Sequence, residues 1–574
     1  MKQNRLFVAV IALVLSAGAA SAQNMYDAIN ISRNEYFGTA RSMGLGNAVT
    51  AVGGDLGMIG INPAGSAVAN YGQFVVTPGL SLSIIEGSYY PEAGMLPPTP
   101  FASKRREPKM TLPNIGVSTV LNTGRSRGVK SFSFAFVSNQ TRDFNYSSSV
   151  LGENSQTSKI AEFAAGAAGW DEFILQDYNS YESSSVSWDI LTAYQAGMFG
   201  SYGNGNNYVG VSEALEDFNH FVPSALAQRS VVVKNGTKDD MILNFGMNIS
   251  DQLFVGVNMG MPSATYSVSE TFIEAAKRPE DFPISFAANG GGSVTTYFNS
   301  GSFVYDYAAS YDGIYGKLGV IYLPSKNLRL GAAIQTPTIY SISEEWQYSA
   351  STSFVDNSFD DRASSPIGSY EYNLVSPYVI NLGVAWTFAH RVLWSMDYEM
   401  TDYSGMRFMA DDDHFGMEDP FYDLNETNRN FAGQSHELRI GAEYRITPQF
   451  SVRAGYSFLT SPERYWQNDL GEDVFASDYL DYFDSYYTGA RYLVSDNKVN
   501  EKSETFAFGI GYASSGSFFA DAVIKANCYP LQRYYPYYDY DNFNAYGEMV
   551  NALSPEIHNY HTLVSVAVSF GWRF

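Results

Sequence analysis

The sequence lacks an apolar run long enough to cross a membrane as a helix. Its one pronounced run extends from Leu6 to Leu15, whereas a membrane-spanning helix needs about 20 predominantly apolar residues. Lipid offers the backbone no hydrogen-bond partners, so only helices and closed β-barrels can span it. We therefore expect the mature chain to be either a soluble exported protein or a membrane-spanning β-barrel.

Cysteine and positive charge are also scarce. The single cysteine, Cys528, excludes an intramolecular disulfide framework and is expected to be a structural thiol. Charged residues make up only 16% of the chain and the formal net charge is −24, which excludes nucleic acid as a partner because phosphates are recognised by basic surfaces. We attribute the negative charge to solvated acidic loops, with divalent-ion contact at the lipid surface as the alternative.

The first 22 residues have the pattern of a secretory signal peptide. Lys2 and Arg5 precede the apolar run, and small residues lead to Ala20-Ser21-Ala22. We predict cleavage before Gln23, which places the mature protein outside the cytoplasm.

Aromatic residues and glycine are what the sequence has in abundance, with 43 Tyr, 38 Phe and 50 Gly. This mixture is typical of β-strands and of aromatic girdles at a membrane surface. In the terminal segment, large apolar residues alternate with small or polar ones up to Trp572 and Phe574. The segment predicts a lipid-facing strand, with the barrel assembly machinery as its partner.

Short and long connections alternate along the chain. Ser250 to Gln252 joins two alternating segments as a tight turn, and similar turns are predicted at 324–327, 389–391, 447–449 and 514–517. The long polar segments are 86–111, 140–239, 273–301, 346–371, 410–435, 460–503 and 530–559. Short turns on one side and long loops on the other are typical of outer-membrane barrels. We predict an all-β, antiparallel, multi-pass barrel of about 14 strands in a Gram-negative-type outer membrane.

A barrel of this size has a lumen too wide for its own side chains to fill. Residues 23–70 precede the barrel (71–574), are rich in small residues and lack clear alternation. We predict that they form a hatch inside the lumen. Glycines at inward positions are expected to leave room for it, although glycine also eases strand curvature. These positions are Gly246, Gly256, Gly383, Gly441, Gly455, Gly509 and Gly571.

A resemblance to a known family supports this interpretation. The hatch contains Asn62-Pro63-Ala64-Gly65 after Gly53-Gly54-Asp55, and several strand motifs follow in the same order as in the family. These motifs are 328–331 with Thr336-Pro337, Asp397-Tyr398 with 401–404, 438–445, 452–456 and 571–574. The chain resembles the FadL-type outer-membrane transporters of hydrophobic compounds, over the hatch and most strands but not the loops.

The resemblance implies passive uptake of long-chain fatty acids or similar hydrophobic small molecules, without a cofactor. It implies capture near the outer loops, gating by the hatch and exit sideways through the barrel wall. Asn62, Pro63 and Ala64 carry over as candidate gating residues, and a purely structural turn explains them equally well. The third strand, Ser131 to Asn139, has no Gly or Pro to mark a kink at which the wall opens.

Two loop features are candidate contacts. Lys104, Arg105, Arg106 and Lys109 form one basic cluster that is suited either to an anionic ligand or to lipopolysaccharide phosphates, or serves solubility alone. The apolar spacing over 160–174 predicts an amphipathic helix. We expect this helix to pack against a neighbouring loop, with ligand capture or membrane contact as alternatives.

Other features do not point to an enzyme or a metal site. Asp411 to His414 lacks the ligand spacing of calcium or zinc sites and is interpreted as a solvated loop. The Tyr534 to Tyr540 run suits glycan stacking or an aromatic girdle. His436, His558 and His561 lie near strand ends without a nucleophile motif. The alternatives that remain are a surface-binding or adhesion protein, a general porin and, less favoured, an outer-membrane hydrolase.

Overall fold

The computed structural model describes most of the chain. The described residues are 25–91, 103–176, 186–202, 206–216, 219–287, 293–357, 359–389, 391–410, 419–467, 473–475, 494–495, 502–543 and 549–574. The predicted signal peptide and Asp411 to His414 therefore lie outside the described residues. No helix in these ranges is long and apolar enough to span a membrane.

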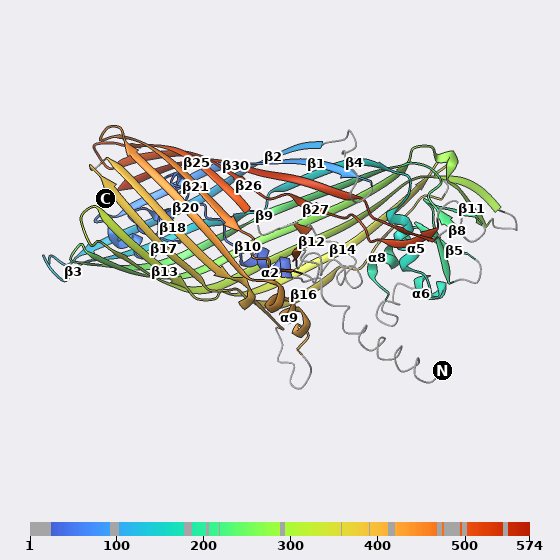
Figure 1. The fold of residues 1–574 in the computed structure, drawn as a ribbon, viewed down its shortest axis with the longest axis horizontal. Helices are drawn as coiled ribbons and strands as arrows, with labels where there is room; N and C mark the ends of the chain where they lie inside the picture. Colours follow the sequence, from blue (N-terminus) through green and yellow to red (C-terminus); the bar gives the residue numbers. More distant parts are fainter. Residues whose placement is uncertain are drawn as a thin grey trace.

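The strands close into an antiparallel barrel (Figure 1). The first strand, β1 (Gln73–Tyr90), pairs with β2 (Ser103–Asn122) on one side and with the last strand, β30 (Glu556–Arg573), on the other. Fourteen strand positions follow one another around the wall, which confirms the predicted number. After β2 they are β3 (Val129–Asp143), β9 (Leu226–Ile249), β10 (Leu253–Ala276), β12 (Ser293–Tyr322), β13 (Leu328–Gln335) with β14 (Ile339–Phe354), β17 (Val379–Phe388) with β16 (Gly368–Val375), β18 (Val392–Asp402) with β19 (Arg407–Ala410), β20 (Gln434–Arg445), β21 (Phe450–Thr460), β25 (Lys502–Ala513), β26 (Phe518–Cys528) and β30.

A band of large apolar side chains on the outer face marks the membrane-spanning part. On β9, Leu243 and Phe245 are 45% and 40% exposed, while Asn244 between them is buried toward the lumen. On β30, Phe570 and Trp572 point outward in the same way. The predicted alternation is therefore confirmed, because outward residues meet lipid and inward residues meet the polar interior.

A line of interruptions marks the outer limit of this band. Each interruption is a proline, a bulge or a short helical turn, and strand pairing places them all at one level of the wall, which β9 and β12 cross without an interruption. They are Pro78, Pro113, Gln140 to Arg142, Pro262, Pro337, Pro377 and the 3-10 turn η3 (Tyr403–Gly405). Proline has no N–H for the ladder, so the sheet is locally released at these positions. We call this line the seam.

Strands continue far beyond the seam on one side of the barrel. The segments predicted as loops at 140–239, 273–301 and 346–371 contain β4 (Tyr146–Asn154) and the outer ends of four wall strands, namely 226–239 of β9, 273–276 of β10, 293–301 of β12 and 346–354 of β14. That part of the prediction was wrong. These strands have no lipid outside them, so the alternation of apolar and polar residues that reveals a membrane strand is weaker there.

Smaller elements complete the outer region and the far ends of the strands. They are β5 (Phe199–Tyr202), β6 (Asn207–Gly210), β7 (Ala214–Glu216), β8 (Asn219–Phe221), η2 (Pro279–Asp281), β11 (Pro283–Ala287), β15 (Asp361–Ser364), α9 (Tyr422–Phe431), β22 (Tyr465–Gln467), β23 (Asp473–Phe475), β24 (Val494–Ser495), β27 (Gln532–Tyr534), β28 (Tyr540–Phe543) and β29 (Met549–Ala552).

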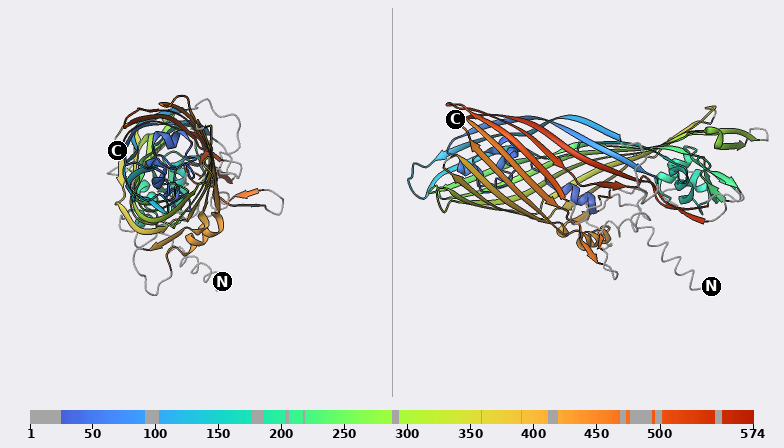
Figure 2. Two further views of the ribbon diagram at one scale, coloured as in Figure 1. Left: turned by 90° about the vertical axis from the view of Figure 1, so that its left-hand side faces the viewer. Right: turned by 45° about the horizontal axis from the view of Figure 1, so that its top comes forward.

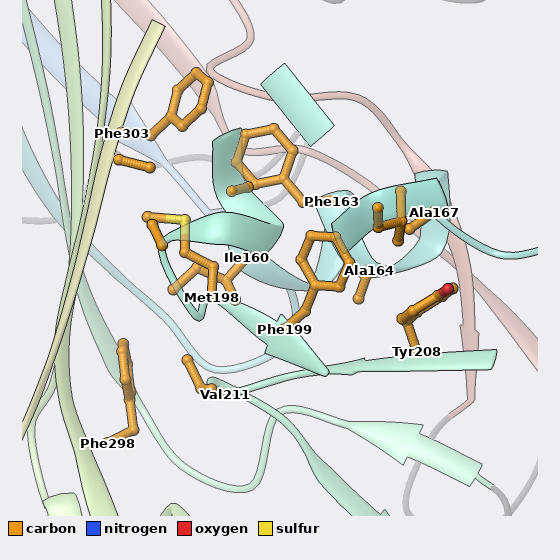
Figure 3. Packing of buried hydrophobic residues seen from close by; sticks show 14 of the residues in the cluster. Ile160, Phe163, Ala164, Ala167, Met198, Phe199, Tyr208, Val211, Phe298 and Phe303 are labelled. Carbon is orange, nitrogen blue, oxygen red and sulfur yellow. The ribbon is translucent and has the colours of Figure 1, made fainter. Parts of the chain in front are cut away.

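The segment between β4 and β9 folds into a small outer domain, whose apolar core it shares with Phe298 and Phe303 of β12 and Phe354 of β14 (Figure 3). The predicted helix over 160–174 is two helices, α5 (Lys159–Gly166) and α6 (Glu172–Gln176), and α8 (Trp188–Gln195) packs beside them. Gly169 has φ +91°, a left-handed conformation that ends the helical path. Ile160 and Phe163 are buried in the core, so packing explains the first half of the amphipathic pattern.

The N-terminal segment lies inside the barrel, as the end-on view in Figure 2 shows. It comprises α2 (Met25–Ser32), α3 (Ala40–Gly44), η1 (Leu56–Met58) and α4 (Gly65–Val68). Leu45, Leu56, Ile59 and Ala64 are fully buried between the segment and the wall. We refer to residues 25–70 as the plug.

Candidate functional site

The plug rests directly on glycines of the wall. A Cβ at Gly455 would lie 2.1 Å from the nitrogen of Gly46, and one at Gly256 would lie 2.3 Å from the carbonyl carbon of Pro63. Neither approach leaves room for a side chain. Of the seven glycines predicted to accommodate the hatch, five face it in this way, a Cβ at Gly509 would reach the plug only at 3.4 Å, and the exception is Gly571. Its Cβ would meet the ring of Phe519 at 2.0 Å, so the predicted role of Gly571 was wrong.

The Asn62-Pro63-Ala64 turn fastens the plug to two wall strands. The Asn62 side-chain amide donates to the carbonyls of Thr50 (2.7 Å) and Val320 (3.1 Å). The Pro63 carbonyl accepts from the Asn244 side chain at 3.0 Å. Ala64 is fully buried, and its N–H donates to Asn62 Oδ1. All of these contacts lie on the membrane side of the seam, where they hold the plug in place.

Buried lysines of the wall hold plug carbonyls at three heights. Lys238 Nζ donates to the carbonyl of Ile31 at 2.7 Å, Lys525 to that of Tyr36 at 3.0 Å, and Lys317 to that of Gly60 at 2.9 Å. The lysines are each at most 4% exposed. A buried ammonium needs such acceptors because burial without them is costly.

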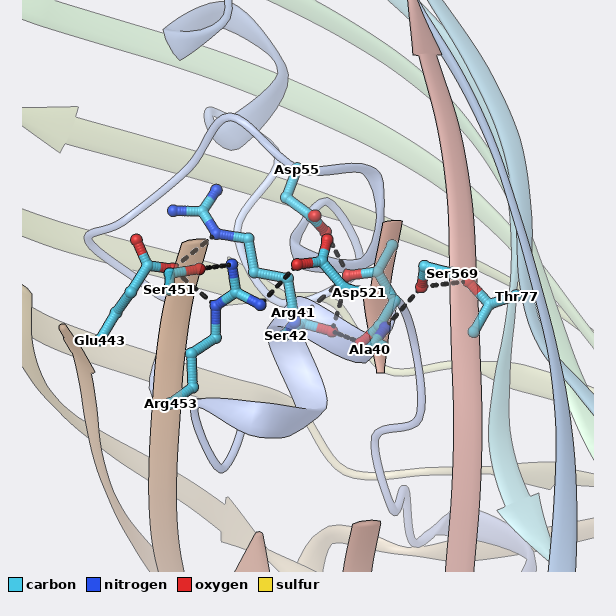
Figure 4. A network of polar contacts seen from close by, with 11 residues as sticks. Ala40, Arg41, Ser42, Asp55, Thr77, Glu443, Ser451, Arg453, Asp521 and Ser569 are labelled. Carbon is cyan, nitrogen blue, oxygen red and sulfur yellow. Dashed lines mark hydrogen bonds and ion pairs between the residues drawn. The ribbon is translucent and has the colours of Figure 1, made fainter. Parts of the chain in front are cut away.

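A charged network closes the inner end of the plug (Figure 4). Arg41 Nε lies 3.1 Å from Glu443, which also accepts from Arg453 Nε at 2.7 Å. Arg453 reaches Asp521 at 2.6 Å. Sequence reasoning missed these residues, although charged side chains at inward positions of β20, β21 and β26 were a readable signal. The network joins α3 to β20, β21 and β26.

An aromatic track lines the inner face beyond the seam. The ring centre of Tyr305 lies 5.1 Å from that of Tyr348 and 6.4 Å from that of Tyr307. The ring centre of Tyr307 lies 6.2 Å from that of Tyr266. Nearer the seam, the buried rings of the same apolar cluster are Tyr311, Tyr340, Tyr372, Tyr403, Phe408 and Phe421. Residues Met25, Ala28 and Ile29 of α2 pack among these rings. We call this surface the aromatic track, and the plug's first helix occupies its inner end.

The outer end of the track opens into a hollow with a cavity volume of about 70 Å³. Its wall includes Lys159, Glu270, Phe303, Tyr305, Tyr348 and Tyr534. We call this hollow the outer pocket. The predicted Tyr-rich segment contributes Tyr534, Tyr535 and Tyr537 to it. Burial raises the pKa of the Glu270 carboxyl, and the neighbouring Lys234 and Lys159 oppose that rise.

One side of the wall is completed by a helix instead of a strand. Among the described residues, β19 pairs only with β16, and α9 lies against its other edge. Asn425 of α9 takes the place of a pairing strand at Phe408, because it binds both backbone groups of that residue. Its side chain donates to the carbonyl of Phe408 at 2.9 Å and accepts from the N–H of Phe408 at 2.8 Å. We call this part of the wall, where α9 covers the free edge of β19, the side opening. Its inner lining is the apolar inner end of the aromatic track.

A second gap in the strand pairing lies between β2 and β3. Their hydrogen bonds end at the Asn114 and Asn139 pair, and β2 continues on β1 alone. Polar side chains bridge this gap: Lys109 Nζ lies 3.1 Å from Asp143 and 2.7 Å from the carbonyl of Gly236. The third strand itself runs without a proline or glycine and bulges at Gln140 to Arg142.

The four predicted basic residues do not form one site. Lys104 pairs with Glu86, Arg105 lies 3.9 Å from Glu107, and Lys109 turns to Asp143. All four stand on the outer half of β2, whose second edge is not paired with β3. Lysine and proline are common on such free edges because they discourage pairing with other chains.

The described residues contain no group of three or more His, Cys, Asp or Glu side chains placed to hold a metal. Of the histidines considered at strand ends, His436 contacts the hydroxyl of Tyr398 at 2.7 Å and His561 contacts Ser83 at 3.1 Å. His558 lies 2.9 Å from Glu556.

The lipid-facing band, the closed ring of strands and the buried N-terminal segment define an outer-membrane β-barrel whose lumen is filled by its own plug. Solved structures of this kind are similar to it. A FadL homologue of Pseudomonas aeruginosa has a TM-score of 0.48 at 10% identity, over 94% of this chain and 99% of that one. The toluene transporters TodX of Pseudomonas putida and TbuX of Ralstonia pickettii each have a TM-score of 0.42 at 12% identity, over 93% of this chain and 98% of theirs.

No family model matches the chain, and no curated protein matches it in sequence.

Proposed function

We propose that the protein is a passive uptake channel for hydrophobic molecules across the outer membrane. The observation that carries this proposal is the aromatic track, which leads from the outer pocket to the side opening above a firmly held plug. A hydrophobic molecule gains free energy by leaving water for such a surface. A general porin needs an open aqueous lumen instead, and the plug occupies that space.

The plug closes the water path while its first helix acts as the movable part. Most contacts that fasten the plug lie on the membrane side of the seam, from the Asn62 turn to the Arg41 network. The α2 helix lies at the seam, where Met25 and Ile29 occupy apolar positions that a ligand would take. A hydrophobic molecule that displaces α2 therefore gains the same ring contacts without moving the rest of the plug.

The side opening is the exit that suits such a molecule. It lies at the outer limit of the lipid-facing band and has an apolar lining. The gap between β2 and β3 is bridged by Lys109, Asp143 and Asn145, whose polar groups a hydrophobic molecule would have to leave without partners. We infer release into lipid beside α9 and not beside the third strand.

Reconstitution in liposomes tests the proposal directly. The purified protein should transfer a labelled fatty acid or aromatic hydrocarbon across the bilayer while it conducts ions poorly, because the plug blocks water but not the apolar route. Steady ion conductance without transfer of either hydrophobic probe would identify a general porin and refute the proposal.

The exit is tested by loosening α9. Asn425→Ala removes both hydrogen bonds to β19, each worth about 1 kcal/mol, and should raise the transfer rate several-fold. Asn430→Ala, on the exposed side of the same helix, is the matched control and should leave the rate unchanged. A rate that responds to Lys109→Met but not to Asn425→Ala would place the exit at the third strand instead.

A further inference from the structure

Lys159 is held rigidly at the rim of the outer pocket. It is the first residue of α5, and the Glu274 carboxylate accepts hydrogen bonds from the backbone N–H groups of Lys159 (2.9 Å) and Ile160 (3.2 Å). Glu274 is itself 1% exposed and also accepts from the Ser158 hydroxyl at 2.7 Å. The first turn of α5 is therefore fixed to β10, and the backbone from which the Lys159 side chain extends has a defined position.

The Lys159 ammonium is nearly desolvated but only partly satisfied by protein acceptors. Its side chain is 11% exposed, and its Nζ donates to the carbonyl of Pro536 at 3.3 Å. The nearest carboxylate oxygen, on Glu162, is 3.9 Å away. An ammonium has three donors, so this arrangement leaves capacity for an acceptor in the pocket.

Aromatic faces surround the same ammonium. Lys159 Nζ lies 4.7 Å from the ring centre of Phe163 and 5.3 Å from that of Phe303 (Figure 3 shows these two rings). The ring centre of Phe303 lies 5.9 Å from that of Tyr348, and the two ring planes are tilted by 32°. The ring centre of Tyr348 lies 5.1 Å from that of Tyr305, with a tilt of 30°. Offset rings of this kind favour a flat aromatic partner over a flexible alkyl chain.

We propose that the outer pocket binds amphiphiles that combine an aromatic ring system with one carboxylate, which Lys159 receives. The inference rests on the proposed uptake function and names the chemical class that enters the channel. The ring system of the ligand lies along Phe303, Tyr348 and Tyr305, at the start of the aromatic track. The four basic residues first expected to receive a carboxylate, Lys104 to Lys109, stand on β2 outside this pocket.

Glu270 of the same pocket does not cancel this attraction. Lys234 as well as Lys159 acts on Glu270, so two cations face this carboxylate. Lys234 Nζ also lies 5.7 Å from the ring centre of Tyr146. Glu162 and Glu274 lie beside Lys159 as well, so an arriving carboxylate is attracted by the Lys159 ammonium itself, among aromatic rings where a charge-assisted hydrogen bond is stronger than in water.

The test compares an acid with its neutral ester. A fluorescent naphthoic acid and its methyl ester are titrated into the full-length purified protein in detergent, with dodecanoate as an alkyl competitor. The acid should bind at least about tenfold more tightly than the ester, which corresponds to about 1.4 kcal/mol. Lys159→Met should abolish this preference and leave ester binding unchanged, whereas Lys159→Arg should retain it. Lys104→Met is the control and should change nothing.

Three results would overturn the inference. They are equal binding of acid and ester by the unaltered protein, equal weakening of both by Lys159→Met, and loss of the preference in Lys104→Met. Dodecanoate that competes as well as unlabelled naphthoate would refute the aromatic preference. Transfer of the methyl ester through the reconstituted protein is measured in parallel. If the unaltered protein does not transfer the ester, the uptake function is refuted. If it does transfer the ester but gives one of the binding results above, only the ligand class is refuted.

Discussion

Individual glycines decide how closely the plug can approach the wall. Gly455 is the tightest example on the inner end, since its missing Cβ leaves room for the backbone of Leu45 and Gly46. Sequence reasoning identified most of these positions because inward glycines stand out in an alternating strand. It misassigned Gly571, because the sequence does not show that the neighbouring strand points Phe519 at that position.

Gly455→Ala should loosen the plug. The added Cβ lies 2.1 Å from the nitrogen of Gly46, and overpacking of this kind costs about 1–3 kcal/mol. We expect a lower melting temperature in detergent and a higher ion conductance. Gly316→Ala is the matched control, because the nearest atom to its Cβ, Thr336 Cγ2, is 3.8 Å away. Equal effects of the two substitutions would show that general strand distortion, and not plug contact, is responsible.

At the scale of elements, the outer domain packs its helices against the wall strands β12 and β14 in one shared apolar core. The periodicity of 160–174 predicted one helix, and the structure has two because Gly169 turns the chain. The strand ends were also misjudged, since β9 and β10 each run for 24 residues. Pairing between neighbouring strands sets those ends, and a single sequence contains little record of it.

His220 makes the outer domain sensitive to acid. Its Nε2 lies 2.6 Å from the Tyr202 hydroxyl, and burial lowers its pKa below the ordinary value of 6.5. The unfolded domain therefore binds a proton more readily than the folded one, so stability is complete above about pH 6.5 and declines as the pH falls through that value. Limited proteolysis of the domain should accelerate between pH 8 and pH 5, and His220→Gln should flatten the profile. An unchanged profile in His220→Gln would assign the sensitivity to other groups.

At the scale of the whole molecule, the seam divides the protein into two parts with different tasks. Below it, 14 strand positions form a closed wall around a fastened plug. Beyond it, strands persist on one side only and carry the aromatic track and the outer pocket. We propose that movement of α2 at this boundary lets the track fill and empty while the barrel stays closed to water.

Deleting residues 23–70 should turn the protein into an open pore. A barrel of 14 strands encloses more space than its side chains fill, so planar-bilayer recordings should change from a mostly closed to a steadily conducting state. Deleting only 25–34 should leave ion conductance low, because the Asn62 turn and the Arg41 network remain. If both deletions conduct alike, α2 and not the body of the plug is the water barrier. Heat-modifiable migration on gels shows whether each variant still folds as a barrel.

The sequence by itself determined that the chain is a lipid-embedded barrel with long outer segments and an internal plug. It could do so because lipid imposes strict alternation on each strand, and alternation is a local property that the order of residues records. The tertiary structure alone decided where the proposed hydrophobic route runs. Residues from strands and loops far apart in the chain come together in the aromatic track, the pocket around Lys159 and the side opening at α9. Strand register and helix packing bring them together, and these two features leave no periodic signal in the sequence.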